Sequence, residues 1–428
     1  MSSPAPDVAA ATSGAASATA AAASAAAAEA YPRIVGALIR ITGDWDLAED
    51  CAQEALATAL QRWPSAGVPD NPAAWLMTAA RNRAIDVLRR ATVERTKLRE
   101  LAVLERGDPA PPESGGFPDD RLRLIFTCCH PALPLEARVA LTLRTICGVR
   151  TADIARAFLV GEATMTRRLT RAKTKIAQAG IPYRVPEGTT LPERLPGVLG
   201  VLYVLFTTGY NADGSPAFAD EAIRLARLLA DLLPTLRPRP DSSEISGLLA
   251  LFLFQHSRRD ARRDDDGRLR TLEQQDRSHW DRAAIAEGVA ILTALDAEPA
   301  HRDGPYALQA RIAACHATAE SVAATDWPRI AHCYDELWLR QPTPVIALNR
   351  AVAHGYARGP RAGLALLAEA RAGGALDDYP LALAAEAGLI ARAGDREHAA
   401  DLFRRAADLA HSPAERDALL ERAAENAP

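Results

Sequence analysis

Cysteine is sparse in this sequence, and its spacing offers no framework for disulfides or for zinc. Six cysteines are spread over 428 residues, and none forms the CxxC pair that zinc sites and redox motifs use. Cys128, Cys129 and His130 are adjacent, and three adjacent side chains cannot all point at one ion. We therefore expect buried structural thiols in a reducing cytoplasm, and no metal site.

Long apolar runs and signal-like segments are also lacking. The longest apolar stretch, residues 198–206, is far shorter than the roughly 20 residues that cross a bilayer. Residues 1–30 are rich in alanine and serine but have neither the basic start nor the leucine-rich core of a secretory signal. These absences favour a cytoplasmic protein with no membrane partner.

Sequence signatures of common enzymes are missing as well. The chain contains no G-x-S-x-G elbow, no P-loop, no Rossmann glycine pattern and no HExxH pair. We therefore expect no catalytic residues, no cofactor and no enzymatic activity.

Charge is distributed unevenly along the chain. The sequence is 48% hydrophobic and 24% charged, with a net charge of −4, so it can bury cores in two to four domains. Between Pro134 and Gly180, however, nine Arg/Lys oppose three Asp/Glu, a local net charge of +6. A basic module on an acidic chain is typical of a DNA-contacting domain attached to other domains.

Residues 151–176 have the pattern of a helix-turn-helix. Ile154 and Phe158 give the first helix an apolar stripe, and Met165 and Leu169 do so for the second, with Gly161 expected at the reversal. A helix-turn-helix puts the start of its second helix against base edges and its cations against phosphates. The candidate DNA-binding residues are Glu162, Thr164, Thr166, Arg167, Arg168, Arg171 and Lys173. A solvated basic helix in a bundle is the alternative explanation.

Residues 31–92 have the spacing of a compact helical unit. Asp44 or Asp46 can cap its second helix, and Asn71 followed by Pro72 can start its third. The second helix is expected to bury Leu47, Cys51, Ala55, Leu56 and Leu60. Its polar face is expected to expose Glu49, Asp50, Gln53 and Glu54.

The rest of the chain reads as helical, so we predict an all-α protein. Helical spacing around Gly394, Ala399, Phe403 and Ala406 matches the second helix of a tetratricopeptide repeat, and a related pair is expected at 345–370. The predicted divisions are a disordered segment at 1–30, units at 31–92 and 119–180 joined by a flexible linker at 93–118, an extension at 186–290 and TPR-like repeats at 291–428.

Three segments resemble bacterial sigma factors of the extracytoplasmic-function (ECF) type. AEDCAQEALATALQRWP (48–64) and PAAWLMTAARNRAIDVLRR (72–90) are similar to region 2, and EARVALTLRTICGVRTADIARAFLVGEATMTRRLTRAK (136–173) is similar to region 4. Segments such as VLYVLFTTGYNADG (201–214) and QDRSHWDRAAIAEG (275–288) resemble the subgroup with a long TPR-like C-terminal extension.

The resemblance implies a sigma factor that directs promoter-specific initiation and binds the clamp and flap of core RNA polymerase. It implies −10 contacts by Trp75, Arg81, Asn82, Asp86, Arg89 and Arg90, with Trp75 equally open to a core role. It implies polymerase contacts by Asp50, Gln53, Glu54 and Gln61. We expect the C-terminal extension to be regulatory, acting on the sigma domains or through another partner. The alternative is a stand-alone helix-turn-helix regulator with a TPR sensor.

Overall fold

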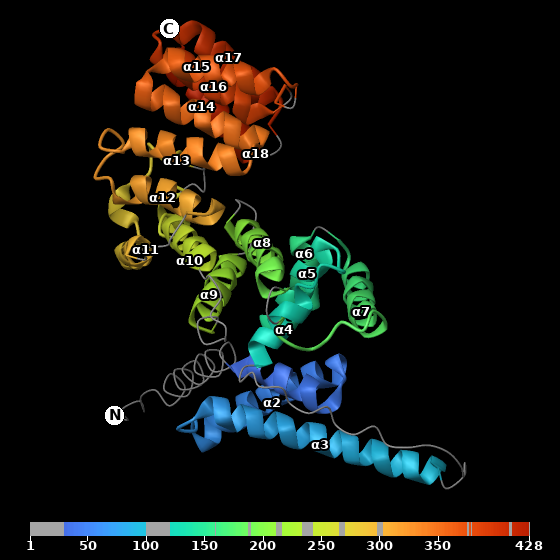
Figure 1. Ribbon diagram of the computed structural model, residues 1–428. Helices are drawn as coiled ribbons and strands as arrows, with labels where there is room; N and C mark the ends of the chain where they lie inside the picture. The colour runs from blue at the N-terminus through green and yellow to red at the C-terminus, as the bar shows by residue number, and fades with distance from the viewer. Residues whose placement is uncertain are drawn as a thin grey trace, which may run out of the picture. The chain divides into compact units, whose positions relative to one another are not determined.

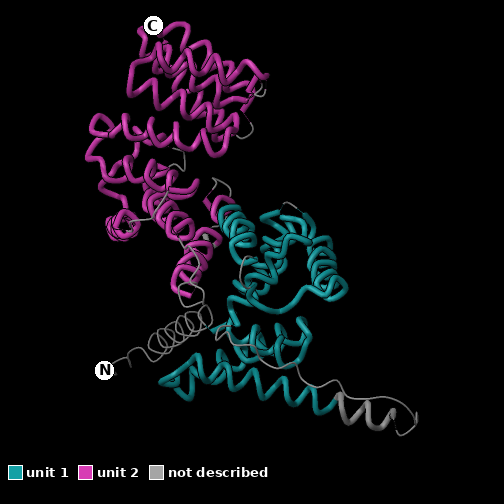
Figure 2. The backbone as a smooth tube through the Cα atoms, in the orientation of Figure 1, with its two compact units in different colours: residues 1–205, 235–240 teal, residues 206–234, 241–428 magenta. Residues whose placement is uncertain are grey.

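The protein is built from helices, as predicted (Figure 1). The computed structural model describes residues 30–99, 120–158, 160–186, 190–210, 216–232, 243–264, 270–297, 303–374, 376–377, 379–410 and 413–427. Of the predicted disordered segment, residues 1–29 lie outside these ranges, whereas Ala30 is buried at the start of the first helix; residues 100–118 of the predicted linker also lie outside them. The chain divides into two compact units, residues 1–205 with 235–240 and residues 206–234 with 241–428 (Figure 2).

The first unit begins with three helices, at 30–42, Trp45–Ala66 (α2) and Pro72–Arg99 (α3). Asp44 caps α2, since its carboxylate accepts hydrogen bonds from the backbone N–H groups of Asp46 (2.9 Å) and Leu47 (3.1 Å). Asn71 caps α3 by accepting from the N–H of Ala74 at 3.0 Å. Helix α3 extends to Arg99, so the segment predicted to be a linker from residue 93 starts as helix.

The next module of this unit contains Asp120–Cys128 (α4), Leu135–Leu141 (α5), the π-helix Thr142–Ile146 (η1), Thr151–Ala157 (α6) and Glu162–Gln178 (α7). Helices α6 and α7 form the predicted helix-turn-helix, with Ile154, Met165 and Leu169 buried between them and their neighbours. Gly161 does not make the reversal through a glycine-only conformation, since its φ of −68° suits any residue.

Helix Thr190–Tyr210 (α8) crosses the boundary between the units, and the second unit continues with Pro216–Leu232 (α9) and Ser243–His256 (α10). Its remaining α-helices are Arg282–Asp296 (α11), Pro305–Thr318 (α12), Trp327–Arg340 (α13), Pro344–Arg358 (α14), Pro360–Arg371 (α15), Pro380–Arg392 (α16), Arg396–Asp408 (α17) and Pro413–Asn426 (α18). The apolar segment of α10 is buried from Gly247 to Phe254.

Helices α14–α18 each pack against the next helix along the chain, as the helices of TPR-like pairs are expected to do. Phe403 is fully buried in a cluster that α16, α17 and α18 share. Helices α14 and α15 approach closely at two glycines: a Cβ on Gly363 would lie 2.7 Å from the Cα of Gly355. The spacing of small residues therefore sets how closely this pair packs.

Candidate nucleic-acid interface

The exposed face of α7 carries five of the seven helix-turn-helix side chains predicted to bind DNA. Glu162, Thr164, Thr166, Arg167 and Arg171 are all exposed. The Thr166 hydroxyl donates to the carbonyl of Glu162 at 3.0 Å, so its methyl group and its oxygen lone pairs remain for a partner. The first two turns of α7 therefore present charged and hydrogen-bonding groups to solvent.

Two cations predicted to bind DNA have protein partners instead of open solvent. Arg168 forms an ion pair with Glu136 at 2.9 Å and lies over the ring of Phe158, 5.9 Å from its centroid. Lys173 contacts carboxylates of α2, its Nζ being 2.6 Å from Asp46 Oδ1 and 3.1 Å from Glu49 Oε1. Only 13% of the Lys173 side chain is exposed. Lys173 is therefore occupied in this conformation, and its phosphate contact stays a prediction.

A groove runs beside α7 on the same module. Its apolar part is formed by Leu133, Pro134 and Ala137, and its basic part by Arg167, Arg171 and other α7 cations. The groove therefore combines the basic face of α7 with the apolar side chains of Leu133, Pro134 and Ala137.

Helix α3 supplies a second exposed polar face, formed by Arg81, Asn82, Asp86, Arg89 and Arg90. Leu76, Ala80 and Ala84 of the same helix are buried, so the exposed side chains share α3 with a packed face.

Trp75 has an intermediate position. Its ring meets the buried Trp63 edge-on, with centroids 5.6 Å apart, and it is only half-buried. Both roles left open by the sequence, core packing and base stacking, are compatible with this placement.

The polar face of α2 agrees only partly with the helical pattern. Asp50, Gln53, Glu54 and Gln61 are exposed, and Glu54 pairs with Arg83 of α3 at 2.6 Å. Leu60, expected on the apolar face, is 50% exposed, because it lies where no other described helix covers α2. Glu49, expected in solvent, is 3% exposed. These two expectations were wrong, since a single-helix pattern does not show which other module covers a face.

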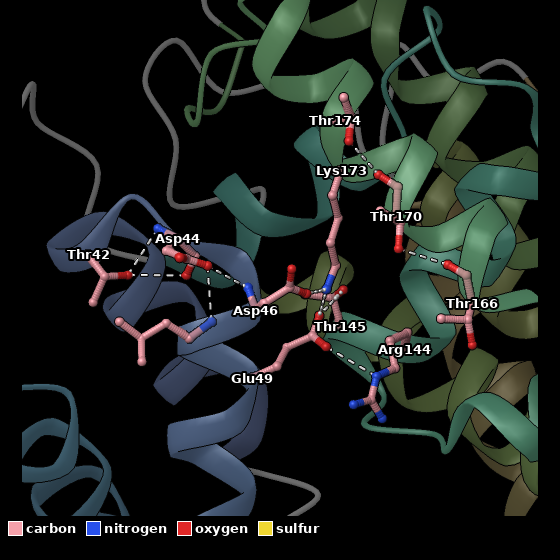
Figure 3. A network of polar contacts seen from close by, with 11 residues as sticks. Thr42, Asp44, Asp46, Glu49, Arg144, Thr145, Thr166, Thr170, Lys173 and Thr174 are labelled. Atoms are coloured by element: carbon pink, nitrogen blue, oxygen red, sulfur yellow. Dashed lines mark hydrogen bonds and ion pairs between the residues drawn. The ribbon is translucent and has the colours of Figure 1, made fainter. Parts of the chain in front are cut away.

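Glu49 is buried by the helix-turn-helix module. Figure 3 shows its carboxylate between Arg144, Thr145 and Lys173. Arg144 Nε donates at 3.1 Å and Thr145 Oγ1 at 2.9 Å. With its amide oxygen turned toward Arg144, Gln53 accepts two more hydrogen bonds, at 2.7 and 3.1 Å. Sequence reasoning missed this network, although an acid at 49 and cations at 144 and 173 supply the matching charges.

The contact between the two modules extends beyond these polar groups. A Cβ on Gly36 would lie 2.9 Å from both the Asp120 Cβ and the Tyr183 Oη, so the helix at 30–42 lies directly against the second module. Tyr183 also meets Trp45 edge-on, with ring centroids 6.4 Å apart.

Burial shifts the titration of several groups in this unit. Burial, followed by the charge of Glu49, raises the pKa of Tyr31 to about 12. Cys128 and Cys129 are buried as expected, and burial raises the pKa of Cys129 to about 11. These thiols are therefore protonated structural groups at neutral pH.

Among the helices that the structure describes, none is long and apolar enough to cross a membrane.

Comparisons with known proteins assign the two modules. The family model described as Sigma-70 region 2 matches residues 27–93, and the one described as Sigma-70, region 4 matches residues 123–176. A family of unknown function, DUF6596, matches residues 194–295.

An uncharacterized protein of Rhizobium meliloti (strain 1021) is 42% identical over 403 residues, which cover 90% of this chain and 91% of that protein. No solved structure matches the chain. Region 2 therefore precedes region 4 along this chain. The chain therefore belongs to the RNA polymerase sigma factors of the sigma-70 family, as one of the ECF type with a helical C-terminal extension.

Proposed function

We propose that α3 captures the unpaired strand of the −10 element while α7 reads the −35 element as duplex. One observation carries this proposal: two exposed, arginine-bearing helical faces occur on separate modules of one sigma factor. Opening a promoter requires one site for duplex DNA and another for a single strand, whose affinities come from different chemistry.

On α3, we assign the phosphates of the captured strand to Arg81, Arg89 and Arg90. Asn82 and Asp86 are one helical turn apart and lie on one face, where an amide and a carboxylate can meet the edge of an unstacked base. Trp75, half-exposed beside Trp63, is placed for a stacking contact at the start of this face.

On α7, the residues of the first two turns divide by chemistry. Arg167 matches the two acceptors of guanine, Thr164 and Thr166 match a thymine methyl or an acceptor, and Glu162 matches the cytosine amino group. The phosphate contacts are assigned to Arg168, Arg171 and Lys173, which fix the helix in the groove.

The exposed residues of α2 are the proposed contact with the polymerase clamp, and region 4 is the proposed contact with the flap. Asp50, Gln53, Glu54 and Gln61 form a polar strip, and Asp50 and Glu54 give it negative charge. Complementary charge at such a surface sets orientation and association rate. Polymerase supplies the chemistry of RNA synthesis, so the chain itself acts as a binding protein in the cytoplasm.

Promoter-dependent transcription with purified components tests this function. The full chain and core polymerase are mixed with fragments of the source genome, and start sites are mapped. We expect RNA chains that begin downstream of a shared pair of elements. The proposal fails if the chain binds promoter-like DNA without polymerase and adds no start sites with it, which is the behaviour of a stand-alone regulator.

We also assign a regulatory role to the C-terminal extension. The consecutive packing of helices α14–α18 supports a binding function, since stacked helix pairs present extended surfaces to partners. A chain that ends at Gly180 keeps both promoter-binding modules. Unchanged promoter output from that truncated chain would refute a regulatory role for the extension.

A further inference from the structure

We propose that the C-terminal extension binds a phosphate group in a partly buried basic cluster, either as inorganic phosphate or as the phosphate of a nucleotide. The cluster consists of Arg258, Arg277, Arg282 and His316, and we call it the Arg277 cluster. All four residues belong to the second unit and lie on or next to α10, α11 and α12, which pack on one another. The site goes beyond the proposed function, since phosphate binding requires neither polymerase nor promoter.

Three segments of the chain bring the Arg277 cluster together. Arg258 lies just beyond the end of α10, Arg277 begins the short 3-10 helix Arg277–His279 (η4), and His316 lies in the last turn of α12. Arg277 Nη1 donates to the carbonyl of His316 at 2.6 Å and to that of Ala319 at 2.8 Å. A single arginine therefore ties the loop before α11 to the end of α12.

The arginines of the cluster have neutral hydrogen-bond partners. Arg258 donates to the hydroxyl of Tyr210 at 2.9 Å and to the side-chain oxygen of Gln255. Arg282 donates to the backbone carbonyl of Arg277 at 3.1 Å, and the acceptors of Arg277 are carbonyls as well. Carbonyl and hydroxyl oxygens orient a guanidinium but leave its positive charge uncompensated. Arginines in this state attract oxyanions, whose geometry matches the guanidinium.

The titration of the cluster shows the cost of gathering these cations. Burial, followed by the charges of Arg258 and Arg277, lowers the pKa of His316 to about 4. Burial, followed by the charges of Arg258 and Arg282, lowers the pKa of Arg277. Both shifts arise because like charges are held close together and partly away from water. A bound anion would offset that repulsion, so the charge distribution favours a negatively charged ligand.

Three buried nitrogen atoms around Arg277 have no hydrogen-bond partner among the described residues, namely Arg277 Nη2, Trp280 Nε1 and His316 Nδ1. The Arg277 guanidinium lies over the Trp280 ring, 4.6 Å from its centroid, and Trp280 is 2% exposed. The third atom, His316 Nδ1, is a donor in one of the two neutral tautomers. Buried polar groups of folded proteins are nearly always hydrogen-bonded. Several unpaired donors around one arginine therefore indicate a ligand that supplies acceptors.

A phosphate group has the chemistry that these donors require. Its oxygens can accept hydrogen bonds from guanidinium, indole and imidazole groups at once. A phosphate monoester carries a charge of about −1.5 to −2 near neutral pH, which suits a cluster of several arginines. A singly protonated phosphate also offers an O–H group. Gln275 Oε1, a buried acceptor that no described residue satisfies, lies two positions before Arg277 in the sequence and could accept from it.

An aromatic surface beside the cluster makes a nucleotide one source of the phosphate. The His316 ring meets Trp327 edge-on with centroids 5.3 Å apart, and Trp327 stacks on Tyr356 with centroids 4.0 Å apart. Trp327 and Tyr356 are only half-buried. Nucleic-acid bases bind to such rings by stacking. Inorganic phosphate would use the Arg277 cluster alone, whereas a nucleotide would also contact the rings.

Titration of the full-length chain with inorganic phosphate and with AMP tests the site. Isothermal titration calorimetry measures the affinity, and sodium chloride at the same ionic strength controls for general salt effects. We expect saturable binding and a rise in the temperature of unfolding that follows the bound fraction. Absence of saturable binding for both ligands up to about 10 mM would overturn the proposal.

Comparison of phosphate, AMP and adenosine separates the two sources of the phosphate group. Equal affinities for inorganic phosphate and AMP would assign the site to phosphate alone. Binding of AMP that is tenfold tighter or more would assign it to a nucleotide whose base contacts the aromatic rings. Adenosine that binds as tightly as AMP would overturn the proposal, because the phosphate group would then contribute nothing.

Two substitutions locate the ligand in the Arg277 cluster. Trp280→Phe keeps an aromatic ring beside Arg277 but removes the indole N–H, so phosphate affinity should fall about tenfold. Arg277→Gln removes a positive charge and should lower the affinity about a hundredfold. The matched control is Arg259→Gln, because Arg259 pairs with Asp220 and Asp260. That control should leave phosphate affinity unchanged.

A milder variant separates loss of binding from loss of folding. Arg282 is exposed at the start of α11, so Arg282→Gln should fold normally and lower phosphate affinity severalfold through the lost charge. For each variant, the effect of phosphate is measured on its own temperature of unfolding. Folded Trp280→Phe and folded Arg282→Gln that both bind phosphate as tightly as the wild type would overturn the proposal. Because polymerase and DNA are absent from these titrations, failure of the proposed promoter activity would not imitate that result.

Discussion

Replacement of Arg167 by alanine should change which promoters are used, with little effect on stability. The side chain is exposed on the second turn of α7, and substitutions at such positions usually change stability by no more than about 0.5 kcal/mol. A bidentate arginine–guanine pair contributes about 1–3 kcal/mol of discrimination. At 1.4 kcal/mol per tenfold, the loss on promoters with the matching guanine is roughly 5- to 150-fold.

The assay is competitive transcription with core polymerase on promoters that differ at single positions of the −35 element. We expect Arg167→Ala to lose its preference at one position and to lose little activity on promoters that already lack the guanine there. Arg171→Ala is the matched control, because loss of a phosphate contact weakens all promoters alike. Equal losses on every promoter for Arg167→Ala would show that Arg167 contacts phosphate.

Three further predictions concern α3, the TPR-like helices and a buried histidine. The double variant Arg89→Ala/Arg90→Ala should reduce the slope of log affinity against log salt by about 1.4 for single-stranded −10 DNA, measured with the polymerase complex, and an unchanged slope would contradict those contacts. Gly363→Ala should destabilise the chain by about 1–3 kcal/mol in denaturant unfolding, since its Cβ would lie 2.7 Å from Gly355, whereas Gly373→Ala has no close neighbour and should be neutral. Burial holds the pKa of His316 at about 4, against about 6.5 when unfolded, so the unfolded chain takes up the proton first and stability falls below pH 6.5, by about 2 kcal/mol at pH 5. His316→Gln should flatten that fall, and an identical pH profile would refute the assignment.

Much of the fold could be predicted because it depends on local patterns. The spacing of Ile154, Met165 and Leu169 identifies the helix-turn-helix, and the cap at Asn71 marks the start of α3. The helical spacing of Ala399, Phe403 and Ala406 marks a buried face, and in the structure these residues belong to the core that α16, α17 and α18 share. In each case the residues that form the apolar stripe or the cap lie within one short segment, so packing against the rest of the chain has little effect on whether the helix forms.

The predictions of burial were wrong at positions where a distant part of the chain determines whether a side chain is covered. Glu49 lies at a position of α2 where the helical pattern predicts exposure to solvent. It is buried because Arg144 and Thr145, nearly a hundred positions later in the sequence, pack against it. The prediction for Leu60 was wrong in the opposite direction: this residue lies on the apolar stripe of α2 but is exposed, because no described helix covers it. Such contacts depend on long-range docking, which helical periodicity does not encode.

A footprint of promoter DNA, with and without core polymerase, tests the central claim that the two sigma modules grip a promoter together only when separated on the enzyme. We expect two protected patches about 25 base pairs apart in the presence of polymerase, and neither patch with the full chain alone at the same concentration. Protection of both patches by the chain alone would contradict it.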